Sequence, residues 1–122
     1  MIDIASFRNV RLQGGFSVAE IRFTHEPLTD ALGREALAQT RIVGMEFRLL
    51  IRSSLNDEEL SVTLYHEILE AAAVASSHPP DSVTNFTEAD FELAARTTHD
   101  SLGEASPENL NRMLQFHGFG GE

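Results

Sequence analysis

The sequence predicts an α+β fold, in which a small antiparallel or mixed sheet of three to four strands, from residues 5–52, packs on three helices. Residues 45–52 alternate between two faces, which is typical of a half-buried strand: Met45, Phe47, Leu49 and Ile51 lie on one face, and Glu46, Arg48, Leu50 and Arg52 on the other. The chain beyond residue 56 has helical periodicity, with a cap at each helix start. No repeat or long linker interrupts the 122 residues, so we expect one domain over residues 1–122, strand-rich in 1–52 and helical in 57–117.

The first strands are expected to form a hairpin. Residues 7–12 and 16–24 are rich in strand-forming side chains, and the segment 13–15 between them contains two glycines, which favour a turn. The apolar alternation slips by one position between Val18 and Ile21, which predicts a β-bulge. Residues 29–40 (TDALGREALAQT) show a weak helical pattern that Gly33 interrupts, so a short helix is expected there.

Three capping signals predict the helices. Asn56, followed by three acidic residues, should begin a helix over residues 57–76, because its side chain can accept a hydrogen bond from the first turn. Thr87 with Asp90 predicts the start of a second helix that ends at Gly103. Ser106, with proline at the first helical position, predicts a third helix over residues 107–117.

Charge and composition exclude several classes of protein. The net charge of −10 argues against nucleic acid or an anionic membrane as a partner, because both require a basic patch. No apolar run approaches the roughly 18 residues of a membrane span. The absence of cysteine fits a reducing cytoplasm, which is the expected location. The acidity is concentrated in residues 56–122, which carry −11; this suits cations but is also common on solvated surfaces.

The first long helix carries the residues on which a functional hypothesis depends. Helical projection places His66 and Glu70 on one stripe, flanked by Glu67, while most of the circumference is apolar. This helix should therefore be buried on most sides, and an ionised carboxylate buried there requires a compensating partner. A divalent metal held by His66 and Glu70, with Glu67 activating water, is one solution. A His–Glu network satisfied by arginine, hydroxyl groups and water is the alternative.

The strand at residues 45–52, followed by a helix with His66-Glu67-x-x-Glu70, resembles the zincin metallopeptidases, whose motif is His-Glu-x-x-His. The resemblance implies one zinc ion, His66 as a ligand and Glu67 as the general base. Glu70 stands at the second ligand position, where the family has histidine. A carboxylate still ligates zinc, but it makes the site more anionic and should lower the Lewis acidity of the metal.

A second set of polar residues lies on the next predicted helix, where Glu88, Glu92 and His99 share one face. By resemblance to gluzincins, in which the third ligand is a Glu on the helix after the motif, Glu88 is the expected third ligand. Glu92, four residues later, is then expected to orient His66, and His99 is a second-shell residue or an alternative ligand. A solvated helix face is the other interpretation of these residues.

Two functions follow from these residues. The first is a zinc-dependent hydrolase, such as a peptidase, that uses a metal-activated water with Glu67 as general base, and that binds a peptide or protein along strand 45–52. The second is a non-catalytic interaction or regulatory domain that retains a zincin-like scaffold without metal. The remaining histidines are assigned no role in either hypothesis: His25 and His78 are expected in solvent, and His117 on the apolar face of the third helix.

Overall fold

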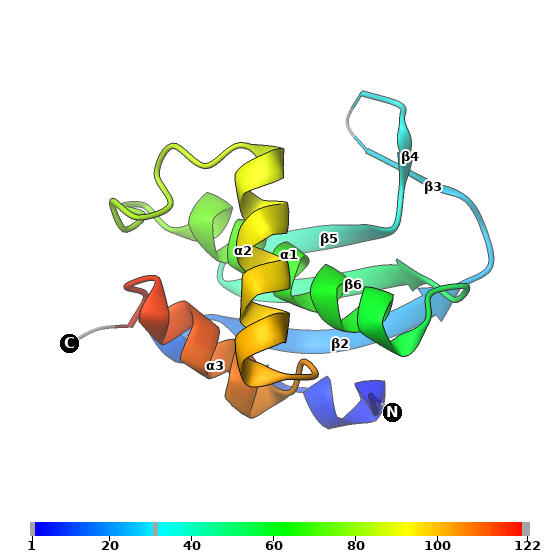
Figure 1. The fold of residues 1–122 in the computed structure, drawn as a ribbon, viewed down its shortest axis with the longest axis horizontal. Coiled ribbons are helices and arrows are strands. Elements are labelled where there is room, and N and C mark those ends of the chain that lie inside the picture. Colours follow the sequence, from blue (N-terminus) through cyan, green and yellow to red (C-terminus); the bar gives the residue numbers. More distant parts are fainter. Residues whose placement is uncertain (1, 31, 121–122) are drawn as a thin grey trace.

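The computed structural model describes residues 2–30 and 32–120, and its frame is a four-stranded mixed sheet in the order β1-β2-β6-β5. The strands are β1 (Val10–Arg11), β2 (Ser17–Thr24), β3 (Leu28–Thr29), β4 (Glu35–Ala36), β5 (Ala38–Val43) and β6 (Glu46–Arg52). The β1–β2 and β5–β6 pairs are antiparallel, whereas β2 and β6 are parallel. Strands β3 and β4 form a separate two-stranded ribbon that extends beyond the sheet (Figure 1).

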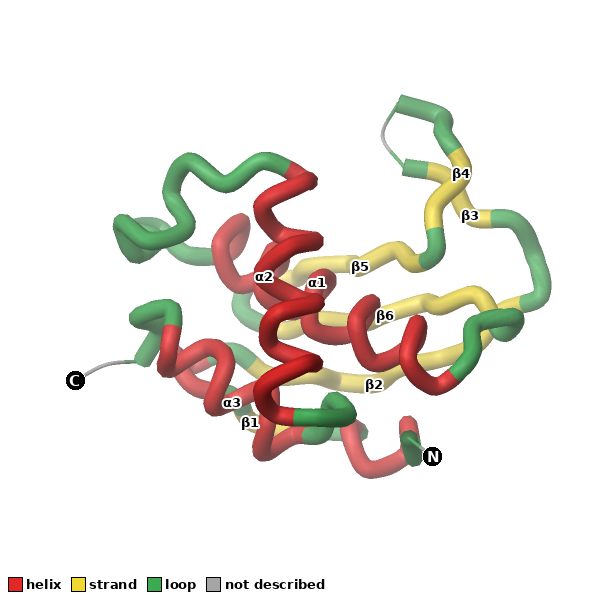
Figure 2. The backbone as a smooth tube through the Cα atoms, in the orientation of Figure 1, coloured by secondary structure: helices red, strands yellow, loops and turns green. Residues whose placement is uncertain are grey.

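The helices are α1 (Asp57–Ala75), α2 (Glu88–Leu102) and α3 (Pro107–Phe116), and two 3-10 turns, η1 (Ile4–Phe7) and η2 (Gln13–Gly15), flank β1. Figure 2 shows the three α-helices on one face of the sheet, with α2 crossing over α1. The expected α+β fold is therefore confirmed. No helix in the described part of the chain is both long and apolar enough to cross a membrane.

The three predicted caps begin the helices as expected. Asn56 and Thr87 each form a reciprocal capping box with the residue three positions later. The Ser106 side chain accepts from the backbone N–H of Asn109. These local bonds satisfy backbone donors that an uncapped first turn would leave without partners. Because each bond lies within four residues of sequence, the helix starts could be predicted from sequence alone.

Helix α1 is the central element of the core. Side chains on nearly its whole circumference are buried, among them Leu64, Ile68 and Leu69, which are fully inaccessible. The core that they form also includes Phe7 of η1 and Leu114 of α3, so one apolar cluster joins both ends of the described chain. The predicted burial of this helix is confirmed, and it holds the backbone of the His66–Glu70 turn in a fixed position.

Two local predictions were wrong. The first expected strand, residues 7–12, shortens to the two residues of β1 because Phe7 belongs to η1 and the next two residues form a turn in which Asn9 adopts a φ of 55°. The helix expected over residues 29–40 is replaced by strands: Asp30 accepts hydrogen bonds from the backbone of Leu32 and Arg34, and Gly33 adopts a φ of 80°. These contacts form a tight loop that ends β3 and starts β4. The predicted bulge in β2 is confirmed by the register shift between Val18 and Glu20.

Strand β6 lies inside the sheet, which corrects the expectation of a peptide bound along residues 45–52. It pairs with β2 on one side and with β5 on the other, so its hydrogen-bonding edges are both occupied. The free edge next to α1 belongs to β5 instead. A strand-like ligand can therefore add to the sheet at β5.

The hydroxyl of Tyr65 connects α1 to the end of α2. This side chain is fully buried, and its hydroxyl donates to the carbonyl oxygen of Gly103 at 2.8 Å. The Tyr65→Phe variant should lose about 1–3 kcal/mol of unfolding free energy, because the Gly103 carbonyl would be left without this donor. Urea denaturation measures the loss. Ser101→Ala, on the exposed side of α2, is the control that should remain close to wild type; equal stability of Tyr65→Phe and wild type would refute the role of this bond.

Candidate metal centre

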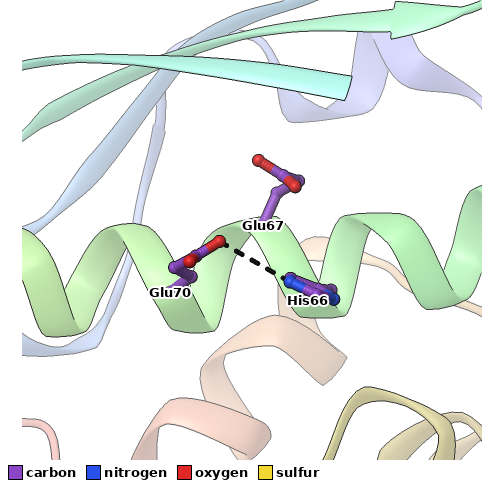
Figure 3. Close-up of side chains that lie close together, drawn as sticks. All are labelled: His66, Glu67 and Glu70. Carbon is purple, nitrogen blue, oxygen red and sulfur yellow. Dashed lines mark ion pairs between the residues drawn. The ribbon is translucent and has the colours of Figure 1, made fainter. Parts of the chain in front are cut away.

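The polar stripe of α1 faces α2 on one side and β5 on the other. His66 and Glu70, one helical turn apart, project on the same side, and Glu67 projects toward the sheet (Figure 3). Only 13% of the His66 side chain and 29% of the Glu70 side chain are exposed. One potential ligand atom from each of His66, Glu67 and Glu70 lies within 4.8 Å of the others. The expectation of a partly buried acidic cluster around one histidine therefore matches the structure.

Three carboxylates surround the imidazole of His66. Its Nε2 lies 3.6 Å from an oxygen of Glu70 and 3.2 Å from an oxygen of Glu88, which comes from the first turn of α2. Its Nδ1 lies 2.9 Å from Glu92, one turn further along α2. Arg96 pairs with the other oxygen of Glu92 at 3.1 Å. The two helices thus bring together four of the residues singled out in the sequence.

These separations suit a single metal ion. Donor atoms bound tetrahedrally to one zinc at about 2.0–2.1 Å lie about 3.4 Å apart. The two distances from His66 Nε2, to Glu70 and to Glu88, lie on either side of that value. The other ring nitrogen is occupied by Glu92, as in metal sites where a carboxylate fixes the orientation of the ligating imidazole. One imidazole and two carboxylates are a donor set compatible with zinc.

Glu67 has a carboxylate oxygen within 4.8 Å of ligand atoms of His66 and Glu70, and its side chain also contacts the sheet. The hydroxyl of Thr40, on β5, donates to a carboxylate oxygen of Glu67 at 2.7 Å. Burial raises the pKa of Glu67, although the Thr40 hydrogen bond and the charge of His66 partly oppose this shift. A carboxylate with a raised pKa, next to the His66 imidazole and at a strand edge, is suited to accept and return a proton.

The cluster strongly favours the protonated form of His66. Burial alone would lower its pKa, but the hydrogen bonds that its ring donates to Glu70 and Glu92, together with nearby negative charge, raise the pKa to about 9. This pKa favours the cationic imidazole, protonated on both ring nitrogens, at neutral pH. A metal that binds Nε2 must displace the proton on that nitrogen.

Glu70 and Glu88 differ in their protonation. A hydrogen bond accepted from His66 lowers the pKa of Glu70. The carboxyl–carboxyl hydrogen bond with Glu70, followed by burial, raises the pKa of Glu88 to about 7. The two neighbouring carboxyl groups can therefore share one proton, which Glu88 holds more readily than Glu70. Such crowding of negative charge is relieved by a divalent cation as well as by a proton.

His99 is not part of this cluster. It lies near the C-terminal end of α2, where its Nδ1 bonds the hydroxyl of the fully buried Ser61 at 2.8 Å. Ser61 also accepts from the backbone N–H of Ala105, so the contact links α1, α2 and the loop after α2. The expectation that His99 is a second-shell residue or an alternative ligand was wrong, because two helical turns separate it from Glu92.

The other histidines lie away from the cluster too. His25 is exposed and bonds Ser53 at 2.7 Å, and His78 is exposed after the end of α1. His117 is half-buried against Phe86, and burial lowers its pKa. None of these three contacts the four-residue cluster of His66, Glu70, Glu88 and Glu92.

Two residues of the site were missed in the sequence. Thr40 was assigned to a helix; the signal for the strand that places it opposite Glu67 is the set of β-branched residues Thr40, Ile42 and Val43 just before Gly44, because residues 38–43 do not alternate in polarity. Arg96 pairs with Glu92 at a spacing of four residues, which is a recognisable helical ion pair. Thr40 thus orients the carboxylate of Glu67, and Arg96 orients that of Glu92, which also contacts His66.

An open groove of about 1270 Å³ runs over the site. Its walls come from α1 and α2 on one side, and from β5 with the β3–β4 ribbon on the other. His66, Glu67 and Glu70 line the groove, so the cluster is accessible to a ligand from solvent.

No family model, curated protein or solved structure matches this chain. The resemblance to zincins therefore depends on the motif residues in the sequence alone.

The contact from Glu92 to Nδ1 predicts a positioning role. Glu92→Gln should weaken zinc affinity by about tenfold or more, because carboxylates that orient a ligating histidine typically contribute about 10–100-fold. Competition with a chromophoric chelator measures the affinity. Glu108→Gln is the matched control, since Glu108 pairs with Arg112 in the same i,i+4 manner on α3. An equal effect of both substitutions would show that only general charge matters.

Proposed function

We propose that this chain is a zincin-like, zinc-dependent hydrolase in which His66, Glu70 and Glu88 hold the metal and Glu67 is the general base. The observation that carries this proposal is the convergence of Glu70 and Glu88 on Nε2 of His66, while Glu92 occupies Nδ1. In many metal sites one ring nitrogen of a buried histidine binds the metal while the other donates a hydrogen bond to a carboxylate.

The chemistry divides between the ion and the chain. Zinc, when bound, supplies a Lewis acid that polarises a carbonyl and acidifies water. Glu67 accepts the proton of the attacking water and returns it to the leaving group. Thr40 holds the Glu67 carboxylate at the edge of β5, and Glu92 keeps the His66 ring in one tautomer and orientation.

A peptide is the substrate that the fold favours. The free edge of β5 presents backbone N–H and C=O groups to the groove, next to the carboxylate of Glu67. An extended chain that adds to this edge places its own amide groups along the groove. The peptide interaction that the sequence predicted along residues 45–52 is therefore proposed for the neighbouring strand, β5.

A non-catalytic interaction domain is the second candidate, and one observation favours it. Within the described residues, no buried side-chain nitrogen or oxygen is left without a hydrogen-bond partner. Protonated His66, the Thr40 hydroxyl and Arg96 satisfy the carboxylates without an added ion. In this case the groove would bind a partner and release it unchanged.

Metal removal distinguishes the two candidates. Hydrolysis of a mixed peptide library, followed by mass spectrometry, should stop after dialysis against a chelator and resume on addition of one equivalent of zinc. The interaction domain would leave every peptide intact under both conditions. Cleavage that persists after zinc removal would contradict the hydrolase mechanism, and the Glu67→Gln protein serves as the control for a contaminating protease.

A further inference from the structure

The free edge strand has two differently charged sides. Thr40 of β5 faces α1, since it bonds Glu67, and alternation along the strand places Arg41 on the opposite side. Arg41 is exposed and lines the same groove as His66 and Glu67. The groove therefore extends around the β5 edge, with carboxylates on the helix side and arginine on the outer side.

Like charges oppose each other on the outer side. Arg41 and Arg48 are direct partners in the antiparallel register of β5 and β6, an arrangement that is unfavourable for two cations. Arg48 pairs with Glu20 on β2 at 3.1 Å. No ion pair or side-chain hydrogen bond engages Arg41 or Arg22 within residues 2–30 and 32–120. Two guanidinium groups in the groove are thus available to an anionic ligand.

We propose that the ligand of this groove is an extended acidic polypeptide, and that Arg41 determines the preference by pairing with a carboxylate on the outward side of the bound strand. The proposal rests on the proposed function in so far as this polypeptide is the substrate. Arg41 lies on the edge strand itself, so an outward side chain of the added strand lies directly beside it. Arg22 lies further into the sheet, beyond β6.

The two sides of the groove set the pattern of the ligand. Inward-facing side chains approach Glu67, Glu70 and Glu88, which repel acidic groups, so these positions should be uncharged. Outward-facing side chains approach Arg41 and should be acidic. Alternating residues of a strand satisfy both conditions at once. A nucleic acid satisfies neither, because it cannot pair with the strand edge and the chain carries −10 overall.

Fluorescence anisotropy with two labelled octapeptides tests the proposal. One peptide alternates threonine and glutamate, and the other alternates threonine and glutamine. Both are titrated with the full chain carrying Glu67→Gln, which prevents cleavage. We expect the glutamate peptide to bind about tenfold more tightly at low salt, and the difference to shrink as salt is added.

Arg41→Gln in the same background should abolish the preference, whereas Arg112→Gln, which removes an exposed arginine on α3, should retain it. A glutamate peptide with N-methylated backbone amides should bind weakly, because it cannot pair with β5. Equal affinity for the two peptides, equal effects of the two arginine variants, or full binding by the methylated peptide would each overturn the proposal.

The test of the acidic-peptide preference can fail or succeed independently of the test of zinc-dependent hydrolysis. Binding is measured with and without zinc, so a chain that binds no zinc but prefers the glutamate peptide refutes the proposed function alone. A chain that binds zinc and cleaves peptides without this preference refutes the role of Arg41 alone.

Discussion

The Glu67→Gln variant should bind zinc as tightly as the wild type and lose about 10²–10⁴-fold in peptide hydrolysis, which is the usual contribution of a general base. The amide keeps the size of the side chain and still accepts from Thr40 at the position that the carboxylate oxygen now occupies. It cannot accept the proton of water. Because Glu67 is not a ligand in this account, the metal should remain.

Two comparisons make that result specific. Glu58→Gln, on the exposed first turn of the same helix, removes one negative charge away from the groove and should leave hydrolysis unchanged. Zinc affinity is measured on the same samples by chelator competition. Hydrolysis by Glu67→Gln at the wild-type rate would remove the assignment of the base, and loss of zinc would mean that Glu67 is itself a ligand.

The His66→Ala variant should lose zinc affinity by more than about 100-fold, since even residues that only orient a ligand contribute about 10–100-fold. His66 is the residue on which Glu70, Glu88 and Glu92 converge, so no neighbouring nitrogen can replace it. Isothermal titration with zinc measures the change.

Folding must be checked in this variant, because removing the imidazole leaves the surrounding carboxylates without their cation. Circular dichroism and the unfolding midpoint establish whether the chain is intact, and His66→Gln provides a polar substitute that fills the same space. His78→Ala is the matched control, because this exposed histidine lies outside the cluster. A folded His66→Ala protein that binds zinc like the wild type would exclude His66 as a ligand.

The helices were the predictable part of the structure. Caps such as Asn56 and Thr87 act within three residues, and the face shared by Glu88 and Glu92 follows from helical pitch alone. That His66 meets these carboxylates was expected only through the resemblance to gluzincins, because no local pattern determines which face of α2 packs on α1. His99 shares the same predicted face but bonds Ser61 instead.

The sheet order could not be predicted in the same way. Whether β6 lies at the edge depends on its parallel pairing with β2, which is separated from it by more than twenty residues, and no local pattern encodes that contact. Residues 29–40 have helix-forming side chains, but the Asp30 loop and pairing with β6 override that preference. The role of Thr40, and the position of Arg41 on the far side of the edge strand, follow only from that pairing.

Equilibrium dialysis of the wild-type chain against zinc, followed by elemental analysis, tests most directly whether His66, Glu70 and Glu88 hold a divalent ion. We expect close to one tightly bound zinc ion per chain, with Glu70→Ala and Glu88→Ala each weakening the binding. A wild-type chain that remains free of zinc, with its cluster held by protonated His66 alone, would contradict it.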